Sequence, residues 1–180
     1  MKKQLKKLKI VVVLSMLAAI SIVTGKYLGI NVGDFMRFSL ENMPIIFAGM
    51  AFGPIAGVLV GAVADLIGCV MMGWVPIPWV TVGAAVIGAV SGVANLLLKK
   101  SPLPLWAVTA AVVFFSHLTG SILIKTIGLS AIYGMPYAIL LGWRTLNYLA
   151  VGIIDAVVIH VLINNKGIKL QLKEIEESSK

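Results

Sequence analysis

Long apolar runs follow one another along this chain, and only short polar or turn-forming segments separate them. A helix rises about 1.5 Å per residue, so about 20 apolar residues cross the ~30 Å hydrocarbon core of a bilayer. A mean hydropathy of +1.02 excludes an ordinary water-soluble domain. We therefore predict an all-α membrane protein with six transmembrane helices. The predicted segments are about 10–29, 43–52, 54–73, 78–98, 103–127 and 137–163.

A Gly53-Pro54 pair separates the second predicted segment, 43–52, from the third, 54–73. Proline cannot accept the preceding helical turn, so the pair ends one helix and starts another. The second segment is too short to span a bilayer straight through, whereas the third is long enough. Asp65 lies inside the third segment, where an ionisable group is costly, so it is a candidate functional residue.

Residues 1–165 are expected to form a single six-helix membrane domain, followed by a short charged cytoplasmic tail at 166–180. An even number of crossings puts both termini on one side of the membrane. That side collects 11 of the 15 basic residues, so both termini are predicted to be cytoplasmic in a multi-pass plasma membrane protein. These lysines lie at helix ends and tails without interleaved aromatic residues. The pattern fits an anionic lipid leaflet and excludes nucleic acid as a partner.

Four basic residues remain near the outer ends of the predicted helices, and aromatic residues such as Trp74 lie near them in the sequence. Cations and aromatic rings together indicate an outward-facing pocket for an anionic, aromatic ligand. The alternative is an aromatic belt with snorkelling lysines, which explains Trp74 but not a basic residue two turns inside a helix. The four residues are Lys26, Arg37, Lys125 and Arg144.

Polar side chains share one face in each of the last two predicted helices. His117, Ser121 and Lys125 follow at i, i+4 and i+8. Such stripes in membrane helices face the bundle interior or a water-filled cavity. His117 has an equally weighted alternative, an interhelical hydrogen bond. The candidate ligand-binding residues are Asp65, Lys125, Arg144, His117, Asn147, Tyr148, Trp74, Arg37 and Lys26.

Several of these residues have competing structural interpretations. Arg37 is as well placed to form a salt bridge with Glu41, four residues on, as to contact a ligand. Asp65 has the alternative of a structural ion pair with His117 or Lys125. For Asp155, deeper in the sixth helix, a structural or coupling role is expected.

The sequence contains no motif for covalent catalysis or for binding a metal or cofactor, and no P-loop for hydrolysing ATP. The chain is therefore not expected to be an enzyme. If it concentrates a solute against a gradient, partner proteins must supply the energy.

Three segments, RFSLENMPII, AGMAFGPIAGVLVGAVADLIG and HLTGSILIKTIGL, resemble the folate-specific S components of energy-coupling factor (ECF) vitamin transporters. The resemblance extends over roughly residues 10–165. It implies high-affinity folate capture at the outer face and a complex with a transmembrane coupling subunit and two ATPase subunits. Family members dock onto the coupling subunit through small-xxx-small motifs on their first helix. Ser15 and Ala19 occupy a comparable place here, with Ser where the family pattern usually has Ala.

Two other functions remain open at this point. The first is an S component for another heterocyclic vitamin or a purine-like base. The second, from a different class, is a small non-transport membrane scaffold without a small-molecule ligand.

Overall fold

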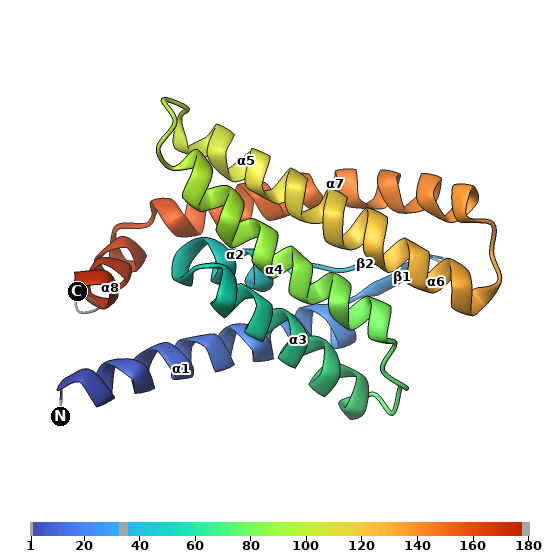
Figure 1. Cartoon of the computed structure of the whole chain (residues 1–180), viewed down its shortest axis with the longest axis horizontal. Helices are drawn as coiled ribbons and strands as arrows, with labels where there is room; N and C mark the ends of the chain where they lie inside the picture. Colours follow the sequence, from blue (N-terminus) through green and yellow to red (C-terminus); the bar gives the residue numbers. More distant parts are fainter. Residues whose placement is uncertain (1, 33–35, 178–180) are drawn as a thin grey trace.

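The computed structural model describes residues 2–32 and 36–177, which form an elongated helical bundle (Figure 1). A two-stranded antiparallel hairpin is the only departure from helix and loop in this described part. The elements are α1 (Lys2–Ile22), the π-helix η1 (Val23–Tyr27), β1 (Ile30–Val32), β2 (Met36–Phe38), α2 (Asn42–Phe52), α3 (Pro54–Met71), α4 (Pro78–Leu98), α5 (Leu105–Ser116), the π-helix η2 (His117–Ile124), α6 (Lys125–Tyr133), α7 (Tyr137–Asn164) and α8 (Lys166–Glu177).

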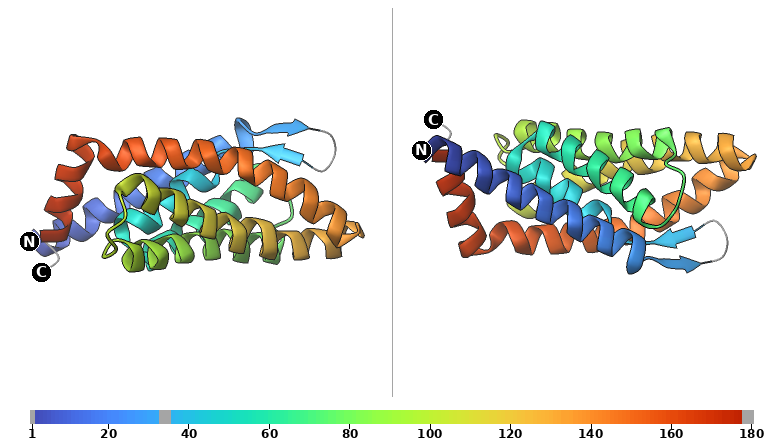
Figure 2. Two further views of the ribbon diagram at one scale, coloured as in Figure 1. Left: turned by 90° about the horizontal axis from the view of Figure 1, so that it is seen from above. Right: turned by 90° about the horizontal axis from the view of Figure 1, so that it is seen from below.

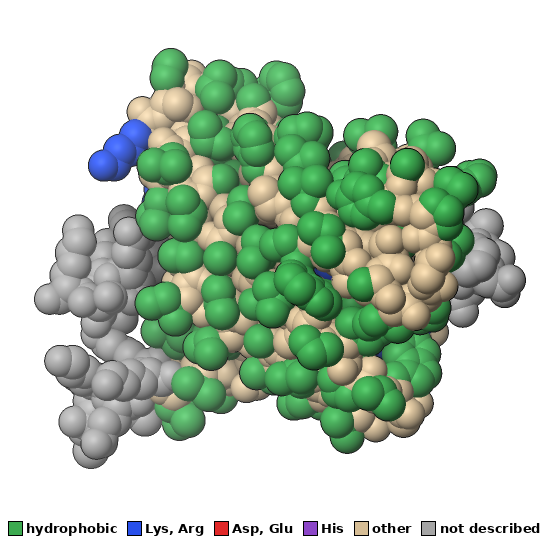
Figure 3. Space-filling model, turned by 45° about the vertical axis from the view of Figure 1, so that its right-hand side comes forward, with side chains coloured by type: hydrophobic (Ala, Val, Ile, Leu, Met, Phe, Trp, Pro, Cys, Tyr) green, Lys and Arg blue, Asp and Glu red, His purple; other side chains and the backbone are tan. Residues whose placement is uncertain are grey.

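Five helical stretches in the described part are long and apolar enough to cross a membrane. One of them, Leu105–Tyr133, joins α5, η2 and α6 into a single stretch of 29 residues. The predicted all-α membrane fold is confirmed, but six full crossings are not, because the segment predicted at 43–52 is only the 11-residue α2. Figure 3 shows a face on which hydrophobic side chains predominate and charged ones are few among the described residues, as lipid contact requires.

The chain turns back on itself between α2 and α3, as the Gly53-Pro54 pair predicts. Gly53 has φ 94°, a backbone conformation that side-chain-bearing residues rarely adopt. Pro54 occupies the first turn of α3, where its missing N–H costs nothing. The Asn95 amide donates a 2.8 Å hydrogen bond to the Met50 carbonyl, one of the carbonyls that the end of α2 leaves without a helical partner.

Helices α3 and α4 pack with their backbones in contact. A Cβ atom on Gly57 would lie 2.7 Å from the carbonyl carbon of Gly88 and 2.8 Å from its Cα atom. Glycine at both positions is what allows this approach, the usual basis of close helix packing in membranes. The core lies between α2, α3 and α4 and reaches α5 and α7, with buried residues such as Ile46, Ile87 and Ile159.

Two segments differ from the sequence-based expectation. Residues 30–42, predicted to be only a turn-forming separator, contain the hairpin of β1 and β2. The tail, predicted only as a short charged segment, contains a separate helix, α8, which turns away from α7 (Figure 2). Ile168 in α8 packs against the hydrophobic core, which gives this helix a buried contact that its charge pattern does not reveal.

Both termini lie at one end of the bundle, and the hairpin and the α6–α7 loop lie at the other (Figure 2). The arrangement agrees with an even number of passes along the bundle axis. Which end faces the cytoplasm stays a prediction.

Candidate functional site

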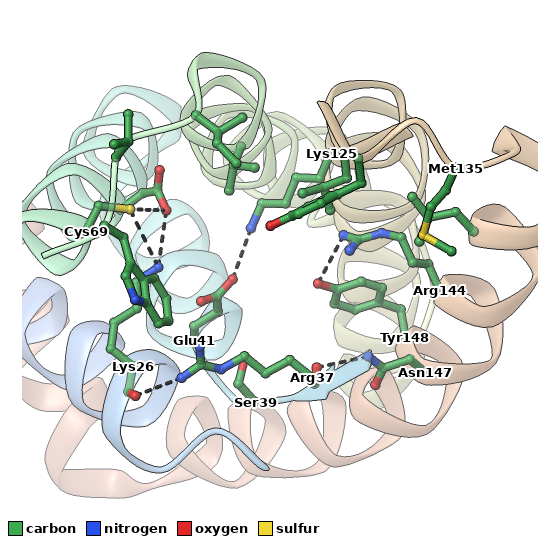
Figure 4. Close-up of a pocket in the computed structure, with 18 of the residues that line it drawn as sticks. Lys26, Arg37, Ser39, Glu41, Cys69, Lys125, Met135, Arg144, Asn147 and Tyr148 are labelled. Atoms are coloured by element: carbon green, nitrogen blue, oxygen red, sulfur yellow. Dashed lines mark hydrogen bonds and ion pairs between the residues drawn. The ribbon is translucent and has the colours of Figure 1, made fainter. Parts of the chain in front are cut away.

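A cavity of about 830 Å³ opens at the end of the bundle opposite the termini (Figure 4). Eight of the nine candidate residues line it, and they come from six different elements or loops. These eight are Lys26, Arg37, Asp65, Trp74, Lys125, Arg144, Asn147 and Tyr148. The sequence-based candidates do not include several further lining residues, among them Ser39, Glu41, Cys69, Met135 and Leu140.

One wall of the cavity is formed around Asp65, on α3. One carboxylate oxygen accepts a 2.7 Å hydrogen bond from the Thr81 hydroxyl, and the other lies 3.5 Å from the Lys26 ammonium. Asp65 therefore forms an ion pair, but with Lys26 and not with His117 or Lys125, the partners of the alternative interpretation. At 3.5 Å the contact is longer than a charge-assisted hydrogen bond, so this oxygen has acceptor capacity left for a ligand.

Trp74, in the loop between α3 and α4, lies beside this wall and close to two cations. The Lys26 ammonium is 5.4 Å and the Arg37 guanidinium 5.2 Å from the centre of its ring system, within cation–π range. These contacts join three segments that are distant in sequence: the end of η1, the hairpin and the α3–α4 loop. They also place a flat aromatic surface at the cavity.

Glu41 lies on the floor of the cavity and pairs with Lys125 at 3.1 Å (Figure 4). Burial opposes the charge on Glu41, but Lys125, Lys26 and Arg37 outweigh it and lower the pKa of the carboxyl to about 2. The Arg37–Glu41 salt bridge, one of the two alternatives for Arg37, is not formed, because the hairpin turns Arg37 toward η1, where it donates a 2.7 Å hydrogen bond to the Lys26 carbonyl. In the sequence, Glu41 could have been recognised as a candidate because it is a charged residue directly before the short apolar helix α2.

The opposite wall is formed by Arg144 and Tyr148 on α7. The Arg144 guanidinium donates through Nε and Nη2 to the Ser121 carbonyl, at 3.2 and 2.8 Å, and through Nη2 to the Tyr148 hydroxyl at 3.4 Å. No protein atom of the described residues bonds to Nη1, which leaves that nitrogen available to a ligand. Asn147 donates a 3.0 Å bond to the Arg37 carbonyl and so ties the hairpin to α7.

His117 does not line the cavity, which corrects its assignment among the ligand-binding residues. It is 3% exposed, and its Nε2 atom lies 2.9 Å from a carboxylate oxygen of Asp155 on α7. The alternative expected from the sequence, an interhelical hydrogen bond, is the one observed. The structural role expected for Asp155 agrees with this contact.

The charges in the cavity do not cancel. Lys26, Arg37, Lys125 and Arg144 contribute four positive charges, while Glu41 and Asp65 contribute two negative ones, which leaves an excess of two positive charges. No group of three or more potential metal-ligating residues occurs within the described ranges 2–32 and 36–177. The arrangement suits an anionic organic ligand with a flat ring.

This fold and cavity define a class of protein: a membrane-embedded helical bundle that holds a small ligand between its helices. A model of the ECF transporter substrate-specific component family matches residues 9–163, and the chain belongs to that family. Family members are transporter components and not enzymes. No sequence among curated proteins matches the chain at a significant level.

Three solved structures share the fold. FolT bound with folic acid has a TM-score of 0.70 and 21% identity, and the match covers 87% of this chain and 93% of FolT. An S component for biotin from an ECF-type ABC transporter has a TM-score of 0.67 and 19% identity, with coverage of 91% and 95%. A bacterial ECF transporter S component has a TM-score of 0.61 and 21% identity, with coverage of 87% and 94%.

Proposed function

We propose that this chain is the folate-binding subunit of an ECF-type ABC importer. The observation that carries the proposal is the polarity of the cavity, with a carboxylate in one wall and a cation in the other. Asp65 suits the adjacent N–H donors of a pterin ring, whereas Arg144 and Lys125 suit the two carboxylates of a glutamyl tail. The excess of two positive charges equals the charge of that tail at neutral pH. The similarity to FolT bound with folic acid supports the same ligand.

The size of the cavity agrees with such a ligand. Small-molecule sites in proteins measure roughly 300–1,000 Å³, and this cavity, at about 830 Å³, lies in the upper part of that range. Trp74 lines the cavity and is partly exposed, so its ring can contact an aromatic ligand. A non-transport scaffold would have no use for such a cavity.

A binding subunit that cannot hydrolyse ATP needs a coupling subunit and two ATPases to drive transport. We propose that α1 docks onto the coupling subunit, because Ser15 and Ala19 are both exposed and lie one turn apart on the same side of this helix. Small side chains at this spacing allow another helix to approach closely. In this arrangement the cavity opens outward and receives folate from outside the cell.

Calorimetric titration of the purified protein with folate tests the proposed ligand. Biotin serves as the competing ligand, because an S component for biotin shares the fold. A second readout is tryptophan fluorescence, since Trp74 lines the cavity and Trp79, Trp106 and Trp143 do not. Folate should quench the parent protein strongly and the Trp74→Phe variant weakly. Binding of biotin but not folate would instead identify the chain as an S component for another heterocyclic vitamin.

Reporter fusions test the orientation that the proposal requires. Because the sequence assigns 11 of the 15 basic residues to the side of the membrane predicted for the termini, a fusion at residue 180 should give a cytoplasmic signal. A fusion inserted next to Trp74 should report the outside. The reverse pattern would place the mouth of the cavity in the cytoplasm and overturn outward capture.

Replacing Arg144 by Gln should weaken folate binding by about ten-fold or more, because charge-assisted hydrogen bonds contribute about 1.5–3 kcal/mol each. Titration calorimetry measures the loss. A pteroate analogue without the glutamate should lose less affinity. Lys100→Gln, in the loop between α4 and α5, removes one positive charge from a residue that does not line the cavity and so controls for net charge. Equal losses for both ligands would show that Arg144 does not meet the glutamyl tail.

A further inference from the structure

A chain of buried polar groups lies behind the Arg144 wall of the cavity. His117 and Asp155 form its inner end, at 2.9 Å. The other ring nitrogen of His117, Nδ1, lies 3.3 Å from the Ser121 hydroxyl, which also accepts a 3.2 Å bond from the Asn42 amide. Asp155 and Ser121 are 0% exposed. Burying so many polar groups is costly unless they are hydrogen-bonded, and none of the proposed ligand contacts explains their presence.

The π-helix η2 presents Ser121 to Arg144. In η2 the Lys125 backbone N–H bonds the Gly120 carbonyl, five residues back, and not the Ser121 carbonyl four residues back. The Ser121 carbonyl instead accepts the two N–H groups of Arg144. A π-helical turn thus provides an acceptor that an α-helix would use internally, which is one reason such turns occur at functional sites.

His117 also supports the second residue of this wall. Its ring lies 5.1 Å from the Tyr148 ring, centre to centre, at an angle of 30°. Tyr148 in turn accepts from Arg144 and lies under its guanidinium at 5.2 Å. His117 therefore contacts both residues that fix the position of the Arg144 guanidinium. These are Ser121, whose carbonyl accepts its hydrogen bonds, and Tyr148, whose ring stacks against it.

We propose that His117, oriented by Asp155, is a positioning residue of the ligand site that holds the Arg144 guanidinium in place through Ser121 and Tyr148. The inference rests on the proposed function, in which Arg144 contacts the ligand. His117 itself does not touch the ligand. Its contribution to affinity is transmitted through Arg144 alone, and this distinguishes positioning from a general effect on stability.

The first test measures whether the effect of His117 depends on Arg144. His117→Gln retains at most one of the two ring contacts and should weaken folate binding about five-fold, less than Arg144→Gln. In the Arg144→Gln background the same change should have no further effect. In the Trp74→Phe background, on the opposite wall, the full five-fold loss should remain. The proposal would be overturned if His117→Gln caused the same loss in the Arg144→Gln background as in the Trp74→Phe background. It would also be overturned if His117→Gln caused no loss in the parent protein.

The second test needs no ligand. The chain has two arginines, Arg37 and Arg144, so ¹⁵N-arginine labelling gives two Nε–H signals, assigned with Arg37→Lys. In the parent protein the Arg144 signal should exchange slowly with solvent, because it donates to the Ser121 carbonyl. In His117→Gln it should exchange at least about five-fold faster while the Arg37 signal is unchanged.

His160→Gln is the matched control, since His160 is the other histidine and lies near the terminal end of α7. It should change neither affinity nor exchange. Unchanged Arg144 exchange in His117→Gln would contradict the positioning role even if folate binds. Faster exchange in a protein that does not bind folate would retain the positioning role and overturn the proposed ligand instead.

Discussion

Asp65→Asn is expected to fold and insert normally and to lose most of the affinity for folate. A pterin ring presents a 2-amino group beside a ring N–H, and these two donors match the two oxygens of a carboxylate, as in the reading of amino-bearing base edges by Asp and Glu. An amide would set a donor against a donor. Leaving a buried polar group unpaired costs about 1–3 kcal/mol, and more if it is charged, which corresponds to a loss of roughly five-fold to more than a hundred-fold.

Calorimetry with folate and thermal unfolding in detergent together test this expectation. The Asp65→Asn side chain keeps one carbonyl oxygen, and Thr81 can still donate its hydrogen bond to that oxygen. The unfolding temperature should therefore change little.

Glu41→Gln is the informative comparison, because it neutralises the other carboxylate of the cavity, which Lys125 already holds at 3.1 Å. If Glu41→Gln lost folate affinity and Asp65→Asn bound folate like the parent, the pterin would contact Glu41 and not Asp65. A heat-labile Asp65→Asn protein would show instead that the Lys26–Asp65 pair is structural.

Gly88→Ala should cause the largest loss of stability among single methyl additions to the bundle. Its Cβ atom would overlap the backbone of Gly57, which cannot move aside as the end of a flexible side chain can. Helices α3 and α4 must then separate, and overpacking of this kind costs about 1–3 kcal/mol or more. Expression level and unfolding temperature in detergent measure the effect.

Gly142→Ala is the matched control for this change. Gly142 also lies within a helix, α7, but no heavy atom lies within 4 Å of the position where its Cβ would be. Alanine favours a helix over glycine by about 1 kcal/mol, so this variant should be neutral or more stable than the parent. Two glycine-to-alanine changes with effects of opposite sign would locate the cost in the α3–α4 contact. A parent-like Gly88→Ala protein would contradict the close packing.

The sequence predicts the helical segments well because membrane burial imposes long apolar runs, and a pair such as Gly53-Pro54 interrupts a run for a local backbone reason. It also predicts the basic residues of the cavity, because a cation such as Arg144 inside a membrane helix needs a polar environment. Both inferences depend on local chemistry and on helix periodicity. Neither requires knowledge of which helices are neighbours.

Pairing between residues far apart in the sequence could not be predicted in this way. Periodicity places His117 and Lys125 on one helical face, but in the structure Lys125 lines the cavity and His117 lies behind its wall. The π-helical turn between them changes the direction of successive side chains, and no local sequence pattern predicts this turn. The i, i+4 spacing offers Arg37 as a partner for Glu41, whereas the bundle brings Glu41 to Lys125, 84 residues away.

The turn at Gly53-Pro54 also determines how deep the cavity reaches. Helix α2, with 11 residues, is about 16 Å long, roughly half the ~30 Å hydrocarbon thickness. The bundle thus gains room for a ligand by shortening one helix, without forcing neighbouring helices apart.

Glu41 and Asp65 lie twelve residues before and after Gly53, so antiparallel α2 and α3 carry both carboxylates to the same level. One residue inserted into either helix would shift its carboxylate by about 1.5 Å along the axis and about 100° around it. The number of residues between the two acids is therefore as much a determinant of the site as the acids themselves.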